Sequence, residues 1–176
     1  MEYIENQTFY HIQRKNNGIN AQMWNVGDTY FIGQQKNRFF EVFDYLTVPV
    51  QQGNIHSYSN ALGHTTKTIR ELSFEEIRKE FFPAHPSRQR GIWVIKPDKD
   101  SLDYWKNELG SADQIIKVQL TGKIHKANQE YLKATTDSLN TIRQRAFHYW
   151  TGTSGANIVE EEILFEGFAE VIEIIE

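Results

Sequence analysis

The C-terminal stretch EEEILFEGFAEVIEIIE, residues 160–176, constrains the fold more than any other segment because it alternates apolar with acidic or small side chains. Successive side chains of a β-strand point to opposite faces, so this pattern is typical of strands with one face against a core. The pair Glu166-Gly167 interrupts the pattern, and glycine is a common turn residue. We therefore expect two strands here, over residues 160–165 and 168–175.

Three consecutive glutamates open this stretch, although acidic residues are poor strand formers. Alternation places Glu160, Glu162 and Leu164 on one face, and it places Glu161 on the other face with Ile163. Two interpretations remain open. Charged residues keep an exposed edge strand soluble, or a pair of carboxylates stabilises the positive charge that develops when a glycosidic bond breaks.

The rest of the chain reads as short strands followed by helices and further strands. Strands are predicted over residues 8–13, 27–33, 91–96 and 113–122, and helices over residues 73–82, 101–109 and within 128–150. Residues 37–45 fit either a helix or a strand, and residues 48–64 predict a long polar loop. This order predicts an α+β fold of one domain, residues 1–176, with a mainly antiparallel sheet.

One predicted helix has a clear start and stop. Glu76 follows Ser73 at the spacing of a capping box, and Pro83 cannot continue a helix. The sequence therefore predicts that this helix begins at Ser73 and ends before Pro83.

Composition excludes several classes of protein. The chain has no cysteine, which excludes disulfides and thiolate chemistry. It has no apolar run long enough to span a bilayer and no basic-then-apolar leader at its start, so we expect a soluble cytoplasmic protein that does not bind membranes.

The net charge of −4 argues against indiscriminate binding to nucleic acid. Residues 67–96 are locally basic, with seven Lys or Arg against four Glu, a bias that fits either a cleft wall or an ordinary solvated surface.

Common catalytic motifs are missing from the sequence. Neither glycine-rich phosphate-binding loop occurs, and there is no zinc-protease helix, EF-hand loop or nucleophile elbow. The six histidines do not stand at the spacing of metal ligands, so we expect no metal site.

Four residues remain as candidates for binding a ligand. His11 lies within an aromatic strand pattern, where a neutral imidazole can bind a ribose hydroxyl or a carboxamide, or can be an ordinary half-buried side chain. Ser87 and Arg88 precede the predicted strand that contains Trp93. Arg88 or Arg90 is suited to a phosphate and Trp93 to stacking, although surface arginines and a core tryptophan fit the same pattern.

Taken in order, the segments FYHI, PSRQRGIWVI and EEEILFEGFAEVIEI resemble the strand-borne His, the central Ser-aromatic motif and the final E-x-E of the ADP-ribosyltransferase superfamily. The chain is similar to the branch that contains tRNA 2′-phosphotransferases and DNA-modifying toxins, and it also looks like a small uncharacterised bacterial family. The resemblance implies a split, mainly antiparallel sheet with flanking helices that cradles NAD as a substrate.

The resemblance also implies a role for each candidate residue. Glu162 would stabilise the oxocarbenium-like transition state, and Glu160 would orient or activate the acceptor. His11 would hydrogen-bond the adenosine ribose or the nicotinamide amide. Ser87 and Trp93 fall in the middle motif, and Arg88 would contact a phosphate.

The sequence therefore leaves three functions open. The first is NAD-dependent ADP-ribosyl transfer to a protein or nucleic-acid acceptor that the sequence does not identify. The second is a catalytically inactive module of the same fold that binds a nucleotide or a protein, since Ile12 and Gln13 replace the small residues that often follow the family's His. The third is RNA 2′-phosphotransferase activity, with the basic segment 67–96 holding the RNA.

Overall fold

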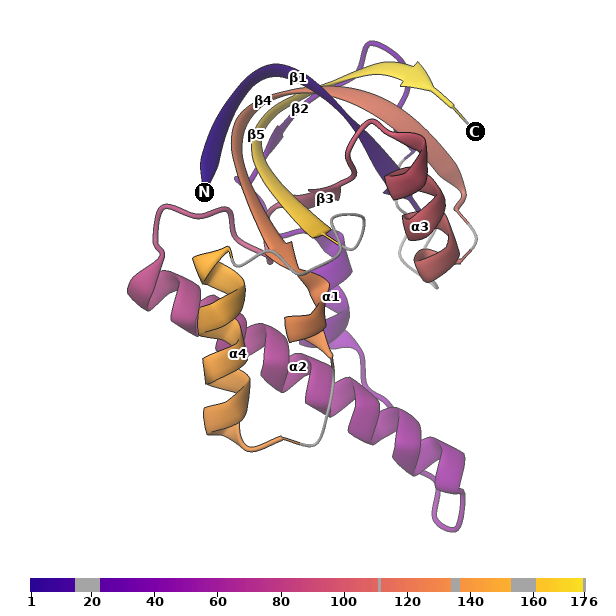
Figure 1. Cartoon of the computed structure of the whole chain (residues 1–176). Coiled ribbons are helices and arrows are strands. Elements are labelled where there is room, and N and C mark those ends of the chain that lie inside the picture. The colour runs from indigo at the N-terminus through magenta and orange to yellow at the C-terminus, as the bar shows by residue number, and fades with distance from the viewer. Residues whose placement is uncertain (15–22, 111, 134–136, 153–160, 176) are drawn as a thin grey trace.

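The computed structural model describes residues 1–14, 23–110, 112–133, 137–152 and 161–175. Helices and a five-stranded, mainly antiparallel sheet make an α+β fold, as predicted (Figure 1). The strands are β1 (Glu2–Gln13), β2 (Thr29–Ile32), β3 (Ile92–Val94), β4 (Gln114–Asn128) and β5 (Glu161–Ile174). The helices are α1 (Arg38–Tyr45), α2 (Ile55–Phe81), α3 (Lys99–Leu109), the short 3₁₀ helix η1 (Gln129–Leu132) and α4 (Leu139–Thr151).

Strand β5 organises the sheet, whose order is β1-β4-β5-β2 with β3 also paired to β5. One edge of β5 pairs with β4 along nearly its whole length. Its other edge is shared, because Ile32 of β2 lies opposite Gly167 and Ile92 of β3 lies opposite Phe165. Ile95, just after β3, exchanges two backbone hydrogen bonds with Tyr10 of β1. The sheet therefore curls around until β3 touches both β5 and β1 (Figure 1).

The predicted turn at Glu166-Gly167 is wrong, because β5 runs through it without a break. Gly167 (φ 145°) lies directly opposite Gly122 of β4 (φ 155°). A Cβ on Gly167 would stand 2.4 Å from the carbonyl oxygen of Thr121, and one on Gly122 would stand 2.3 Å from that of Glu166. The glycines let the two backbones approach closely within the curved sheet, and they do not end a strand.

Helix α2 begins eighteen residues before the predicted start at Ser73. Its cap is Asn54, whose side chain accepts hydrogen bonds from the N–H groups of His56 and Ser57. Ser73 lies inside the helix and donates its hydroxyl to the carbonyl of Ile69. The predicted loop over residues 48–64 is therefore helical from Ile55 onward, while the predicted end before Pro83 is confirmed.

The other elements follow the predictions with shifted limits. Residues 37–45, which fitted a helix or a strand, form α1. The strand predicted over 113–122 continues to Asn128 as β4. The long helical pattern within 128–150 divides into η1 and α4, with Ser138 capping α4. Within the described part of the chain, no helix is long and apolar enough to cross a membrane.

Two apolar clusters lie on opposite faces of β5, as the alternation predicted. Ile163 and Phe165 belong to the cluster inside the curved sheet, together with Val118. Leu164 belongs to a second cluster, between the sheet and helices α2 and α4, together with Trp150. Glu162 shares the face of Leu164 and so points toward the helices.

We predict that Gly167→Ala destabilises the protein by about 3 kcal/mol or more, because the added methyl meets backbone atoms at a φ that side chains disfavour. Gly63→Ala is the matched control. Gly63 lies within α2, and a Cβ there meets no atom within 4 Å. Alanine should therefore raise the free energy of unfolding by about 0.5–1 kcal/mol there. Urea unfolding of both variants tests this, and equal stability of Gly167→Ala and the parent chain would contradict it.

Candidate functional site

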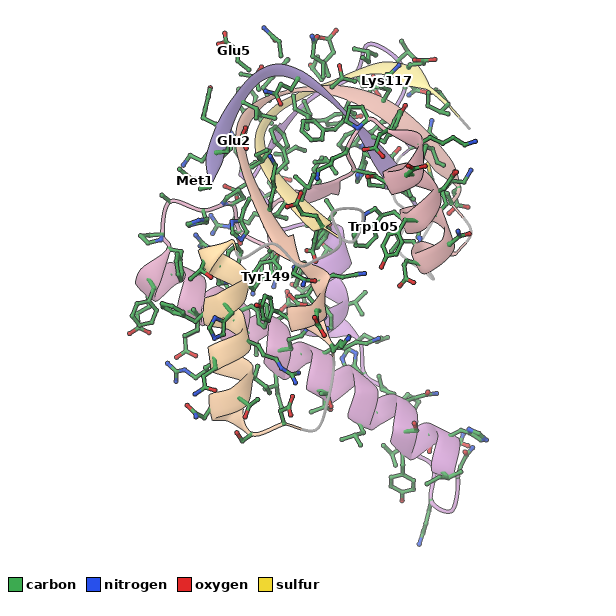
Figure 2. The ribbon with its side chains drawn as sticks, viewed as in Figure 1. Met1, Glu2, Glu5, Trp105, Lys117 and Tyr149 are labelled. Atoms are coloured by element: carbon green, nitrogen blue, oxygen red, sulfur yellow. The ribbon has the colours of Figure 1, made fainter. Side chains whose placement is uncertain are left out.

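A cleft of about 840 Å³ opens beside the edge of the sheet where β2 and β3 meet β5. Residues from β1, β2, β3, α2, α3 and the start of β5 line it. In Figure 2, Trp105 marks the α3 side of the cleft, and Tyr149 marks the place where α4 meets the sheet. Among the predicted site residues, His11, Arg88, Trp93 and Glu162 all line this cleft.

Glu162 is 4% exposed and stands at the start of β5. One of its carboxylate oxygens, Oε1, accepts hydrogen bonds from Nη1 of Arg88, from the indole Nε1 of Trp93 and from the hydroxyl of Tyr149, the last at 3.1 Å. Within the described residues, the other oxygen, Oε2, accepts no hydrogen bond. The three donors fix the carboxylate, and Oε2 is left to interact with a ligand in the cleft.

Arg88 is the buried cation that holds this carboxylate. Its Nε and Nη2 donate to the two oxygens of Glu71 at 2.8 and 3.2 Å, and its Nη1 donates to Tyr149 at 2.9 Å and to Glu162. Four of its five N–H groups are therefore used within the protein. Burial lowers the pKa of Arg88, but the carboxylates of Glu162 and Glu71 outweigh burial and raise it well above its ordinary value. Arg88 stays charged and is committed to carboxylates.

Glu71 balances the charge of Arg88 from helix α2. Burial raises its pKa, but Arg88 and Arg70 outweigh burial, so the pKa of Glu71 lies below its ordinary value. Arg70 reaches Glu71 at 2.7 Å. Two arginines and two glutamates thus form a cluster with no net charge, which lowers the cost of burying them.

The turn before β3 directs Arg88 inward. Ser87 is buried and accepts a hydrogen bond on its carbonyl from the N–H of Gly91 at 2.7 Å. A Cβ on Gly91 would stand 2.8 Å from the carbonyl oxygen of Phe165, so only glycine fits against β5 there. Ser87 also donates its N–H to Glu166 and its hydroxyl to Glu75. It holds the turn and is not among the residues that line the cleft.

His11 presents one ring nitrogen to the cleft. Its Nδ1 donates a hydrogen bond to the carbonyl oxygen of Trp93 at 2.8 Å, which assigns the ring proton to Nδ1 because a carbonyl only accepts. Burial lowers the pKa of His11, with the Trp93 carbonyl acting in the opposite sense. Nε2 is therefore a neutral acceptor. Trp93 joins the two sides of the site, since its carbonyl holds His11 and its indole holds Glu162.

Two aromatic side chains form a flat wall beside His11. Trp24 and Tyr30 are stacked with ring centroids 4.1 Å apart, and the ring of His11 lies 5.4 Å from that of Trp24. The hydroxyl of Tyr30 donates to Asp28 at 2.9 Å. Burial and this aspartate raise the pKa of Tyr30 to about 12, so its ring stays neutral. The wall gives a planar ligand a surface for stacking.

Arg14 adds a positive charge to the cleft wall. Its Nε and Nη2 are buried and have no hydrogen-bond partner in the part of the chain that the structure describes. Buried guanidinium nitrogens without partners are costly unless a ligand supplies acceptors. Arg14 therefore marks a place for an anionic group.

The neighbours of Glu162 have different surroundings. Glu161 pairs with Lys96 at 2.8 Å, and it does not line the cleft. Glu160, the other carboxylate of the predicted pair, lies outside the described residues. Of the two glutamates that the structure describes, Glu162 is thus the one whose side chain lines the cleft.

Several residues of the site gave no signal in the sequence. Glu71 and Tyr149 lie within helical patterns that do not distinguish a buried ionic contact from a solvated one. Trp24 and Tyr30 come together only through the pairing of β2 with β5. Arg14 stands three residues after His11 and directly after the end of β1, and this position is its one local signal in the sequence.

No group of three or more His, Asp or Glu side chains in the described ranges is placed to hold a metal ion. A family model described as "Protein of unknown function (DUF2441)" matches residues 9–176, which include every residue of the site. No curated protein matches the chain.

We predict that Arg88→Met lowers the free energy of unfolding by about 3–5 kcal/mol at neutral pH, because two glutamates lose their buried counter-charge. Without Arg88 the pKa of the Glu71 carboxyl rises in the folded state, because burial, which raises it, is then opposed by Arg70 alone. The folded variant then binds more protons than the unfolded chain. The loss in its free energy of unfolding relative to the parent therefore shrinks as the pH falls from 7 toward 5.

Arg90→Met is the matched control for this prediction. Arg90 is exposed and lies two residues away in the same turn, so its loss should change the stability by less than about 0.5 kcal/mol. Urea unfolding at both pH values measures all three proteins. A deficit of Arg88→Met that does not depend on pH would contradict the assignment of buried, ionised partners.

Proposed function

The chain belongs to the DUF2441 family, and we propose that it is an NAD-dependent ADP-ribosyltransferase. One observation carries the proposal. His11 from β1 and Glu162 from β5 line the same cleft, and Trp93 contacts both of them. A neutral imidazole acceptor and a fixed carboxylate are the groups needed to hold ribose hydroxyls and to stabilise positive charge at a ribose carbon.

The remaining walls of the cleft suit the other parts of NAD. Its volume of about 840 Å³ lies in the range of sites for small molecules and cofactors. The stacked Trp24 and Tyr30 offer a surface for the nicotinamide or adenine ring. Arg14 supplies a cation for the diphosphate, a role that the sequence had suggested for Arg88.

In the proposed reaction the bond between C1′ of the ribose and N1 of nicotinamide breaks, and nicotinamide leaves with the electron pair. C1′ develops oxocarbenium-like positive charge, which the carboxylate of Glu162 stabilises while its Oε2 accepts a hydrogen bond from a ribose hydroxyl. A nucleophile of the acceptor then bonds to C1′ and releases its proton to water. Glu160, two residues before Glu162 in the chain, is proposed to orient or activate that acceptor.

Arg88, Trp93 and Tyr149 act on this reaction through Glu162. Their hydrogen bonds hold Oε1, so the carboxylate needs no rearrangement when charge develops. The bidentate contact of Arg88 with Glu71 shares its charge between two carboxylates, which leaves Glu162 able to attract a cationic centre. They are positioning residues for the proposed chemistry.

A second function is favoured by the burial of Glu162. At 4% exposure, and with three donors on one oxygen, this carboxylate also fits a purely structural role. The protein would then be a nucleotide-binding module without turnover. Saturable binding of NAD in calorimetry, with no nicotinamide released by the parent chain, would identify this alternative.

We predict that Glu162→Gln slows the release of nicotinamide from NAD by about a hundredfold or more, because the amide cannot stabilise positive charge. Glu161→Gln is the matched control, since it makes the same change one residue away, at a side chain that pairs with Lys96 outside the cleft. Chromatography of nicotinamide, with labelled NAD and cell extract as the acceptor source, measures both. Equal rates for the parent chain and Glu162→Gln would overturn the proposal.

We predict that Arg14→Gln weakens the binding of NAD and of ADP-ribose about tenfold or more, because a charge-assisted contact to the diphosphate is lost. Binding of nicotinamide riboside, which has no diphosphate, should not change. Arg143→Gln is the control variant, since Arg143 pairs with Glu76 and does not line the cleft. Calorimetry tests this, and unchanged affinity for both diphosphates would remove Arg14 from the site.

A further inference from the structure

Helix α2 extends past the rest of the fold, that is, past the sheet and helix α4, which we call the body. Its buried residues all lie in its C-terminal part, and they are Glu71, Ser73, Phe74, Glu75 and Ile77. Figure 1 shows the N-terminal half of α2 projecting away from the sheet and beyond the start of α4. About half of a helix of 27 residues therefore extends beyond the packed core.

The projecting half carries an apolar stripe with the spacing of a coiled coil. Its members are separated by three and four residues in turn, which is the a/d pattern of a heptad repeat. The stripe consists of Ile55 (74% exposed), Tyr58 (47%), Leu62 (57%), Ile69 (42%) and Leu72 (60%), with Thr65 at the remaining position. Isolated apolar side chains on a surface are ordinary, but a continuous exposed row of them marks an interface.

The stripe is not the edge of the existing core. The body packs against the other side of α2 through Phe74 and Ile77, which occupy the f and b positions of the same heptad. The a/d face is thus turned away from the helices and strands that α2 already contacts. Among the described residues no helix packs on this face, and a helix from a second molecule would satisfy a heptad seam there.

The positions that flank the stripe are small and uncharged. They are Ser59, Ala61, Thr66 and Thr68. In coiled coils these e and g positions commonly carry charges that select a different partner or exclude an identical one. A neutral, small-residue seam meets no like charge when it faces a copy of itself, and it allows two helices to approach closely.

We propose that the stripe formed by Ile55, Tyr58, Leu62, Thr65, Ile69 and Leu72 pairs with the same stripe of a second copy, in antiparallel orientation. A parallel pair would place both bodies at the same end of the paired segment, because each body is attached at the C-terminal part of α2. An antiparallel pair places them at opposite ends around a twofold axis near residues 62–65. Leu62 of each copy then faces Thr65 of the other.

The size of the surface agrees with a dimer. The five apolar side chains are each about half exposed or more, which leaves on the order of 100 Å² per side chain to bury. Two stripes together would bury roughly 1,000 Å², the lower limit for a specific interface. The proposal concerns a surface away from the cleft and does not depend on the function proposed above.

Analytical ultracentrifugation of the full chain over a wide range of concentration tests this proposal. We expect a species of twice the 20.6 kDa of one chain, with Leu62→Glu converting it to monomer. Asn60→Glu is the matched control, because Asn60 lies at the f position opposite the seam and the dimer should persist. Circular dichroism checks that the helices of each variant remain. A parent chain that stays monomeric throughout would overturn the proposal and leave the stripe to a different partner.

Disulfide trapping tests the orientation, because the chain has no cysteine of its own. Leu62→Cys combined with Thr65→Cys should cross-link two copies on mild oxidation. Ile55→Cys alone should not, since antiparallel pairing sets the two thiols about 25 Å apart along the axis, far beyond disulfide reach. Cross-linking through Ile55→Cys and not through the central pair would overturn the antiparallel arrangement.

Discussion

The buried guanidinium of Arg88 is the interaction on which the rest of the structure depends. It joins Glu71 from α2, Tyr149 from α4 and Glu162 from β5, and so it ties two helices to the central strand. Each partner would be a costly buried polar group without it. The rings of Phe74, Trp93 and Tyr149 stand 5.1–5.8 Å from its central carbon and exclude water from the contact. The same cation therefore holds together the second apolar cluster, between the sheet and helices α2 and α4, and fixes the carboxylate of Glu162 in the cleft.

Strand β5 carries this arrangement from the core to the cleft. It pairs with β4 along one edge and with β2 and β3 along the other, and the Gly122-Gly167 contact lets it curve without a break. The curvature brings β3 against β1, where His11 bonds to the backbone of Trp93. A rigid strand pair thus positions the acceptor of His11 and the carboxylate of Glu162 on one cleft, and rigid support is what a binding or catalytic site needs.

Predictions from the sequence were right where the deciding signal was local. Alternation assigned Glu162 to the face of Leu164, because side-chain direction follows from the backbone of one strand. Predictions failed where the role of a residue depended on a residue from another part of the chain. Gly167 was predicted to form a turn, but the residue must be glycine there because Gly122 of the paired strand lies directly opposite. Residues 48–64 looked like a loop, since their helical heptad faces outward and Asn54, not Ser73, caps the helix.

The sequence by itself determined the α+β class, the strands that carry His11, Trp93 and Glu162, and the absence of disulfides, because periodicity and composition act over a few residues. Only the tertiary structure decided what each polar group faces. Arg88, expected to contact a phosphate, is committed to Glu71 and Glu162. Arg14, beside the cleft, keeps two buried nitrogens that have no hydrogen-bond partner among the described residues. Charge pairing depends on distances between residues far apart in the chain, and those distances exist only after the sheet has curled and the helices have packed against it.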